Sequence, residues 1–218
     1  MTRHILLLCL LGNPFELNLG GHQRTVLEII EHFKDMPRLE ITVITTTKSS
    51  LKQLTPNHLY SNIVLYEISI KKEWFENQDL LYDNRNFLYE TVKKIYENIK
   101  HPITLVHSTY WISGLLASQL CTEYHLTQIH SVISTSCERK RNGFSPVSSH
   151  QYESEQFFLP KVDCIISITE SEYELLIEKY HLEPHKIIVV GRTVSDCFLR
   201  LAHLPSGNLE QDVSVNYN

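Results

Sequence analysis

Cysteine pairs are missing from this sequence: its five cysteines are widely spaced, odd in number, and form no C-x-x-C motif. This excludes the common spacings of zinc knuckles and thioredoxin-like redox sites. Each cysteine lies in or near an apolar segment, where a free thiol behaves as a small hydrophobic group. We therefore expect reduced thiols and a cytoplasmic location. The five are Cys9, Cys121, Cys137, Cys164 and Cys197.

Long apolar runs and an excess of positive charge are also missing. No run approaches the about 20 residues that span a bilayer. The apolar run after Arg3 and His4 has the look of a signal peptide, but residues 13–16 make no small-residue cleavage site, which favours a buried first strand. Lys plus Arg number 20 against 25 Asp plus Glu, so the net charge is -5. This balance disfavours a dedicated nucleic-acid binder.

The size of the chain bounds its organisation. Of 218 residues, 42% are hydrophobic and 21% are charged, which supplies a sizeable core and excludes global disorder. Domains usually contain about 100–200 residues. The chain is therefore either one large domain or one half of a two-lobed enzyme.

Short apolar runs, several of them rich in Ile and Val, alternate with helical patterns along the chain. Continuous apolar runs are typical of strands that are buried on both faces of a parallel sheet. With right-handed crossovers, the alternation predicts an α/β fold with a doubly wound, mostly parallel sheet of about seven strands. The expected strands are residues 5–11, 40–46, 63–70, 104–107, 127–132, 164–168 and 186–190.

Apolar residues between the strands recur with the period of a helix. Helices are expected around Val26 to Phe33, over residues 79–100, from Ile112 to Leu120, and over residues 173–180. Thr169-x-x-Glu172 predicts a capping box before the last of these. Residues 48–62 are expected to be a polar connection, residues 134–149 a loop at a strand end, and residues 199–218 a linker or disordered tail.

Gly20 and Gly21 open the first predicted helix, directly after the first strand. Glycines there let backbone N–H groups approach a ligand closely, and a helix N-terminus attracts anions. The spacing does not match the G-x-G-x-x-G fingerprint of dinucleotide sites. A turn that only packs the strand against the helix explains the pair equally well.

Two predicted strands end in histidine. His107 is followed by Tyr110 and Trp111, at the sheet edge where ligands bind in open α/β folds, although packing also explains all three. His130 ends the next strand and could shuttle a proton or bond a sugar hydroxyl.

Charged residues follow this second histidine. The triplet Arg139, Lys140 and Arg141 could hold a phosphate or carboxylate, or it could be a solvated loop. It is the one compact basic segment on which membrane association could rest. Further along, Glu155 and Asp163 could bind partners, but acidic residues in such places are more often surface groups, which is the interpretation preferred for both.

In order and spacing, these segments resemble the N-terminal domain of family 4 glycosyltransferases, which are retaining enzymes of GT-B architecture. The glycine pair is similar to their glycine loop, residues 107–114 to His-x-His-Tyr-Trp-x-Ser-Gly, and Ile129-His130-Ser131 to a strand ending in Thr-x-His. Residues 162–167 are similar to the strand before their Ser/Thr-x-x-Glu helix. Residues 186–198 are similar to a segment that ends in Pro-Asn-Gly-Val-Asp. The resemblance covers residues 1–198.

The resemblance implies a Rossmann-like lobe whose partners are a nucleotide-sugar and a small-molecule or glycan acceptor, with no metal and no other cofactor. Gly20 and Gly21 would contact the donor phosphates or the acceptor. His130 would be catalytic and would hydrogen-bond the transferred sugar. The acceptor-binding residues would be His107, Tyr110, Trp111, Arg139, Lys140 and Arg141.

The sequence departs from the family pattern in several places. Thr109 stands where the family has its second histidine, residues 191–193 replace the Pro-Asn-Gly turn, and Ser195 replaces its Asp. The family's second lobe, with a basic pair and a Glu-x7-Glu motif, has no counterpart after Phe198. We therefore expect a truncated, acceptor-side half that is weak or inactive without a separate C-terminal lobe.

Two alternatives stay open. The fold could be a non-catalytic binding or regulatory module, which Thr109 and the altered turn favour. It could also be a Rossmann-like nucleotide-binding enzyme, although the missing glycine fingerprint and the missing ribose-binding acid count against this.

Overall fold

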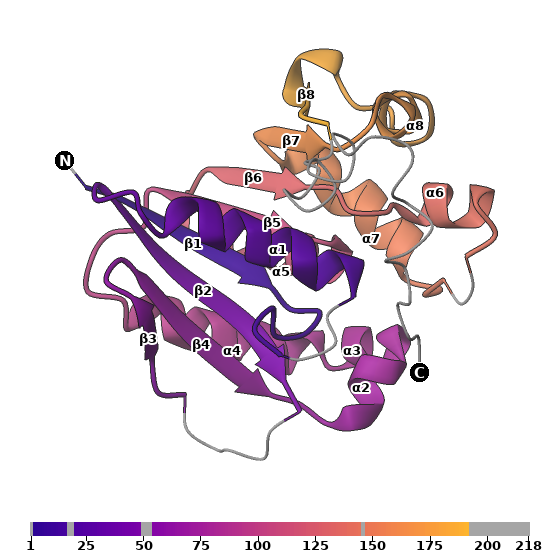
Figure 1. Cartoon of the computed structure of the whole chain (residues 1–218). Coiled ribbons are helices and arrows are strands. Elements are labelled where there is room, and N and C mark those ends of the chain that lie inside the picture. Colours follow the sequence, from indigo (N-terminus) through magenta and orange to yellow (C-terminus); the bar gives the residue numbers. More distant parts are fainter. Residues whose placement is uncertain (1, 17–19, 49–53, 145–146, 192–218) are drawn as a thin grey trace, which may run out of the picture.

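The computed structural model describes residues 2–16, 20–48, 54–144 and 147–191. These residues form one eight-stranded sheet with the order β3-β4-β2-β1-β5-β6-β7-β8 (Figure 1). All neighbouring strands are parallel except the edge pair β3 and β4. The strands are β1 Arg3–Cys9, β2 Leu39–Thr47, β3 Asn57–Tyr60, β4 Ile63–Ser69, β5 Leu105–Thr109, β6 Gln128–Ser131, β7 Cys164–Ser167 and β8 Ile187–Val189. The predicted doubly wound, mostly parallel sheet is confirmed.

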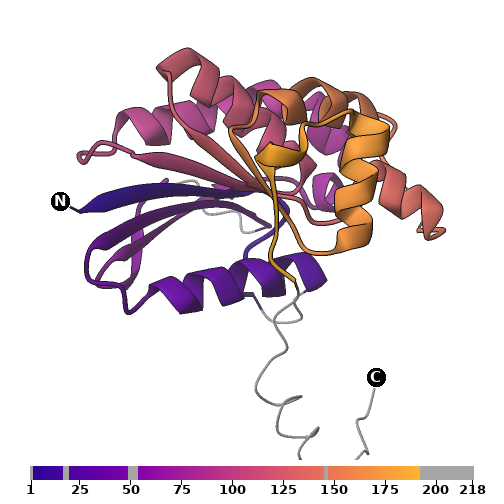
Figure 2. The ribbon, with the colours of Figure 1, turned by 90° about the horizontal axis from the view of Figure 1, so that it is seen from above.

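Helices cover both faces of the sheet. Figure 2 shows α1 on one side and α4 and α5 on the other. In the part of the chain that the structure describes, no helix is long and apolar enough to cross a membrane. The helices are α1 Gly21–Phe33, α2 Lys72–Glu76, α3 Gln78–Asp83, α4 Arg85–Glu97, α5 Trp111–Tyr124, α6 Ser136–Arg141, α7 Gln151–Phe158 and α8 Glu170–Tyr180, with two 3-10 turns, η1 Leu159–Lys161 and η2 Pro184–Lys186.

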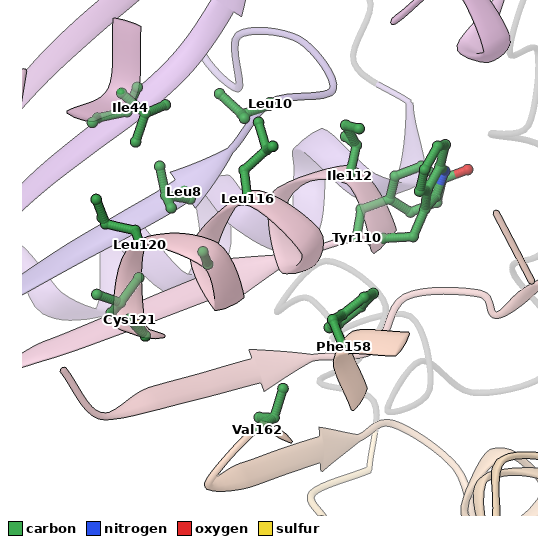
Figure 3. Close-up of a cluster of buried hydrophobic side chains, with 14 of the residues drawn as sticks. Leu8, Leu10, Ile44, Tyr110, Ile112, Leu116, Leu120, Cys121, Phe158 and Val162 are labelled. Atoms are coloured by element: carbon green, nitrogen blue, oxygen red, sulfur yellow. The ribbon is translucent and has the colours of Figure 1, made fainter. Parts of the chain in front are cut away.

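Strand β1 shows why its sequence is apolar at every position from Ile5 to Cys9. Side chains alternate between the two faces of a strand, so a strand covered on both sides needs apolar residues on both. Leu8 lies in a large core with Leu116 and Leu120 of α5, whereas Leu7 lies in a smaller core with Val26 of α1. Figure 3 shows the strand side chains of the large core facing those of α5. The apolar run after His4 is therefore part of a central strand, as predicted.

Three local expectations were wrong. Residues 48–62 were expected to be only a connection, but they contain β3, an antiparallel edge strand. Its four residues are too few to show an alternating pattern: Leu59 and Tyr60 pack against the smaller core, and the backbone pairs with β4. The single helix expected over residues 79–100 is two helices, because Asn84 ends α3 and begins α4. The loop expected over residues 134–149 contains α6, whose first turn is capped by Thr135 through the Glu138 amide at 3.1 Å.

The predicted capping box at α8 forms in one half. The Thr169 hydroxyl accepts a hydrogen bond from the Glu172 amide at 3.1 Å, as the motif predicts. The Glu172 carboxylate does not return to the Thr169 amide. It accepts from the Ile168 amide at 3.0 Å, the Ser167 hydroxyl at 3.1 Å and the Ser134 amide at 3.4 Å. The glutamate therefore ties the chain after β6 to the chain after β7.

Candidate functional site

The candidate site lies at the carboxyl ends of β1, β5 and β6, beside the start of α1 (Figure 1). Ser108 pairs with His130 and Thr109 pairs with Ser131 across β5 and β6. Because side chains alternate along a strand, His107, Thr109 and Ser131 lie on the α1 side of the sheet. Ser108 and His130 lie on the α5 side. The two histidines predicted from the strand ends therefore lie on opposite faces.

The start of α1 is open. Gly20 is the N-cap and no side chain caps the helix. Both Gly20 and Gly21 are exposed, and a Cβ placed on Gly21 would meet nothing within 4 Å. The first amide groups of a helix have no partner within the helix. Gly21 thus leaves room for a ligand at donor groups that the helix itself does not satisfy, whereas a Cβ on Gly20 would lie 2.8 Å from Gln23 Oε1.

The imidazole rings of His22 and His107 lie on the α1 side of the sheet. His22 Nε2 lies 3.1 Å from the Thr109 hydroxyl oxygen, and His107 Nε2 lies 2.8 Å from the Ser131 hydroxyl oxygen. Burial lowers the pKa of both histidines to about 4. Both rings are therefore neutral at physiological pH, and each can give or accept one hydrogen bond per nitrogen according to its tautomer.

His130 is held in the interior on the α5 side. Its Nδ1 lies 2.9 Å from the Ser108 hydroxyl oxygen, which also accepts from Gln128 Nε2 at 3.1 Å. The ring packs edge-on against Phe158 and is 2% exposed. Burial, and then the neighbouring His107, lower the pKa of His130 to about 3. The ring stays neutral at physiological pH, so it acts as a hydrogen-bonding group and not as a cation.

Tyr110 and Trp111 are packed, with their polar atoms already engaged. The Gln78 side-chain oxygen accepts from the Tyr110 hydroxyl at 3.1 Å and from the Trp111 indole at 3.2 Å. Both rings are buried. Tyr110 has a φ of 67°, which is unusual for a large residue and marks a strained junction between β5 and α5. Acceptor binding by these two residues stays a prediction.

The basic triplet forms the last turn of α6, where positive charge is favoured by the helix dipole. Arg141 donates to the Ser171 hydroxyl of α8 at 2.8 Å, and the Lys140 ammonium lies 5.6 Å from the Tyr152 ring of α7. Lys140 and Arg141 are exposed. The structure therefore places Lys140 and Arg141 beside α7 and α8. Arg139 is partly buried, and burial raises the pKa of Tyr110 while the charge of Arg139 opposes that rise.

Glu155 was expected to be a surface group, and this expectation was wrong. Glu155 is 3% exposed, and its carboxylate accepts from the Ser136 amide at 3.0 and 3.2 Å and from the Tyr180 hydroxyl at 2.5 Å. Burial raises its pKa to about 7. Glu155 thus anchors the start of α6. Asp163, in contrast, is exposed as expected and accepts from the Gln128 amide.

A cavity of about 250 Å³ lies between α6 and α8, next to the loop held by Glu172. Its lining is mixed, with carboxylate, amide and hydroxyl groups beside an exposed Phe144. Within the described ranges, no three His, Cys, Asp or Glu side chains are arranged to hold a metal ion. The lining residues are Ile133, Ser134, Glu138, Asn142, Phe144, Ile168, Thr169 and Glu172.

Sequence reasoning missed His22, Ser131 and Gln78. His22 directly follows the glycine pair, so its place at the edge could have been inferred from its position on the helix. The pairing of Ser131 with His107 depends on strand register. The role of Gln78 depends on how α3 packs, and no local pattern encodes that contact.

Comparisons with known proteins identify the family and the fold. A family model described as Glycosyltransferase Family 4 matches residues 19–196. No curated protein sequence matches the chain significantly. Sucrose-phosphate synthase from Thermosynechococcus elongatus superposes with a TM-score of 0.68 at 17% identity, covering 93% of this chain and 53% of the synthase chain.

Two further solved structures have the same fold. Arabidopsis thaliana UGT89C1 complexed with UDP-L-rhamnose gives a TM-score of 0.59 at 10% identity, covering 94% of this chain and 55% of that one. A glycosyltransferase from Rickettsia africae gives 0.51 at 16% identity, covering 96% and 48%. The chain thus spans about half the length of each of these three structures.

Proposed function

Because the chain belongs to glycosyltransferase family 4 and has the fold of an N-terminal GT-B domain, we propose that it is the acceptor-side lobe of a retaining glycosyltransferase. In this proposal it transfers a sugar from a nucleotide-sugar donor and needs a second lobe to bind the nucleotide. The observation that carries the proposal is the open start of α1 beside the ends of β5 and β6. Ligands of open α/β sheets bind at this edge.

The proposed roles follow from the protonation states. The Ser108 hydroxyl lies closer to His130 Nδ1, at 2.9 Å, than to the Ile129 carbonyl, at 3.4 Å. Its proton is therefore given to Nδ1, and the His130 ring carries its own proton on Nε2. A neutral N–H of this kind suits a sugar oxygen. Because its pKa is about 3, His130 does not serve as a general acid at neutral pH.

The remaining roles are less central to the chemistry. Gly20 and Gly21 provide the ligand loop, and His107 orders the edge through Ser131. Lys140 and Arg141 offer exposed positive charge for an anionic part of the acceptor. No part of this scheme requires a metal ion.

The test is nucleotide release from a UDP-sugar or GDP-sugar. The 218-residue chain alone should release little, and adding a family 4 donor-binding lobe should raise the rate. His130→Ala should abolish the gain. His4→Ala is the matched control, because His4 is also buried and bonded to a hydroxyl, Thr42 at 2.9 Å, but lies at the amino end of β1. Robust turnover by the chain alone would refute the need for a second lobe.

A non-catalytic binding module is the second candidate. The packing of Tyr110 and Trp111 favours it, because the hydroxyl of one and the indole N–H of the other are already bonded to Gln78 within the protein. Saturable ligand binding with no nucleotide release, with or without the added lobe, would support this candidate. Release that survives His130→Ala would contradict the catalytic role of that residue.

A further inference from the structure

The cavity between α6 and α8 takes no part in the roles proposed above. It lies at the carboxyl ends of β6 and β7, because its lining includes Ser134, which follows β6, and Ile168, which follows β7 (Figure 1). Ser134 is four positions after His130, so the Cα atoms of these two residues lie at most about 14 Å apart. The cavity therefore shares the ligand edge of the sheet with the candidate site.

Two features fix the shape of this cavity before any ligand binds. The buried Glu172 carboxylate accepts from the Ser134 amide at 3.4 Å and from the Ile168 amide at 3.0 Å, so it ties together two parts of the lining. Ser134 has a φ of 71°, which is unusual for a residue with a side chain. Strained backbone of this kind is concentrated at ligand and active sites. A preformed cavity also lowers the cost of ordering on binding.

The size of the cavity limits what it can hold. Its volume of about 250 Å³ lies just below the range of about 300–1,000 Å³ that is usual for pockets that hold drug-sized ligands. A complete nucleotide-sugar is therefore too large for it. A single six-membered ring with its hydroxyl groups is of a suitable size.

The lining offers the groups that a sugar ring requires. Phe144 is 58% exposed, so its ring presents an apolar surface to a ligand. Glu138 and Asn142 lie one turn apart at the end of α6, and within the described ranges neither side chain has a hydrogen-bond partner. A carboxylate accepts hydrogen bonds from hydroxyl groups, and an amide both donates and accepts them. The hydroxyl groups and the apolar C–H face of a sugar thus both find partners here.

The charge of the lining disfavours an anion. Burial and, to a smaller extent, the charge of Glu138 raise the pKa of Glu172 to about 7. Two carboxyl groups thus lie at one small cavity, where they would repel a phosphate or carboxylate group of a ligand. Arg141 does not line the cavity and donates instead to the Ser171 hydroxyl of α8. A neutral ligand that carries hydroxyl groups avoids this repulsion.

We propose that this cavity binds one neutral sugar ring of a glycan acceptor. Hydroxyl groups of the ring bond to Glu138 and Asn142, and its apolar face packs on Phe144. The inference rests on the proposed function and deepens it, because it names the acceptor as a glycan. The acceptor then has a second subsite besides the strand ends that carry His130, and a short oligosaccharide reaches both.

The test is an NMR titration of the full 218-residue chain, labelled with ¹⁵N and with ¹³C in the phenylalanine rings. The probes are the neutral sugars glucose, galactose and mannose, and their uronates, which are anions. At least one neutral sugar should shift the Asn142 side-chain amide and the Phe144 ring saturably. The corresponding uronate should bind about 2- to 5-fold more weakly. No saturable response to any neutral sugar, equal or tighter binding of the uronate, or shifts confined to His107 and His130 would each overturn the proposal.

Variants separate recognition from folding. Phe144→Ala should weaken sugar binding by about 2- to 10-fold, the value of one aromatic contact. Phe157→Ala is the matched control and should leave binding unchanged, because Phe157 is also exposed, at 60%, but lies under the Lys161 ammonium and does not line the cavity. Equal losses of affinity in these two variants would contradict the assignment.

A third variant tests the role of charge. Glu138→Gln keeps the shape of the side chain and removes its charge. At pH 6, where Glu172 is mostly protonated because its pKa is about 7, this variant should bind the neutral sugar and its uronate equally well. A preference for the neutral sugar that survives the substitution would contradict the proposed contact with Glu138.

These readouts need no transfer reaction. If nucleotide release with an added lobe fails but the sugar binds as expected, this inference stands and the catalytic proposal falls. If release succeeds but no sugar binds in the cavity, the proposed function stands and this inference falls.

Discussion

Alanine at Gly114 is expected to destabilise the fold, although alanine normally stabilises a helix. Gly114 lies in the first turns of α5, where a Gly-to-Ala change gains about 1 kcal/mol of helix propensity. An added Cβ would lie 2.4 and 2.5 Å from two ring carbons of Phe158 and 2.8 Å from His130 Cε1. Phe158 is completely buried, so its ring has no free space to enter.

The two effects differ in size. Overpacking of this kind costs about 1–3 kcal/mol, and contacts this short place the cost at the upper end. The net loss should be about 2 kcal/mol. For a chain of about 200 residues, this lowers the melting temperature by about 4–8 °C. Urea unfolding followed by circular dichroism measures the loss directly.

A matched substitution controls for helix propensity. Gly21→Ala is the same chemical change in a helix, but the new methyl group meets nothing within 4 Å. It should be neutral or stabilise the fold by up to about 0.5 kcal/mol. Adding Phe158→Leu to Gly114→Ala should restore part of the loss, because neighbouring substitutions couple. The reasoning is refuted if Gly114→Ala unfolds at or above the urea concentration of the unsubstituted protein.

Three further substitutions test other contacts. Gln78→Ala removes the acceptor shared by the Trp111 indole and a tyrosine hydroxyl, and should lower the free energy of unfolding by about 1–3 kcal/mol. It should also change the fluorescence of Trp111, measured in a Trp74→Phe background so that only one tryptophan emits. Unchanged emission would contradict the bond. Thr169→Ala should lower the free energy of unfolding by about 1 kcal/mol, because it removes the N-cap of α8. A loss below about 0.3 kcal/mol, near the limit of measurement, would argue against capping. Burial raises the pKa of Glu155 to about 7 in the folded protein, whereas the same group in the unfolded chain has a pKa of about 4.5. The free energy of unfolding therefore falls as the pH rises from about 4.5 to 7. Glu155→Gln should flatten the fall of stability over that range in urea titrations, and an equal slope would refute this.

The sheet could be predicted because its signals are local. The apolar run of β1 reflects burial on two faces, and Thr169 caps the next helix through its own third neighbour. Both patterns are complete within a few residues. The order of the motifs along the chain indicated glycosyltransferase family 4, which no single motif could have indicated.

The parts that were missed depend on contacts between distant segments. Strand β3 is too short to show an apolar pattern, and its place is set by pairing with β4 and by packing of Leu59 and Tyr60 against the smaller core. Burial of Glu155 depends on Tyr180, 25 positions away. His22 meets Thr109 because the start of α1 lies beside the end of β5, which is 87 positions away in the sequence. The spacing of residues along the sequence does not show which distant segments lie together, so these contacts can be seen only in the folded structure.

The sheet divides the interior into two unequal cores, and this division bears on motion. Helix α1 is held by Val26 and Ile30 over the smaller core, whereas α5 lies in the larger one. Local opening begins where fewest apolar contacts must be broken. The helix that carries the glycine pair should therefore exchange its amide hydrogens sooner than α5. At the ligand edge of the sheet, α1 is thus the more flexible helix and α5 the more rigid one. A bound ligand should first slow the exchange of amide hydrogens in α1.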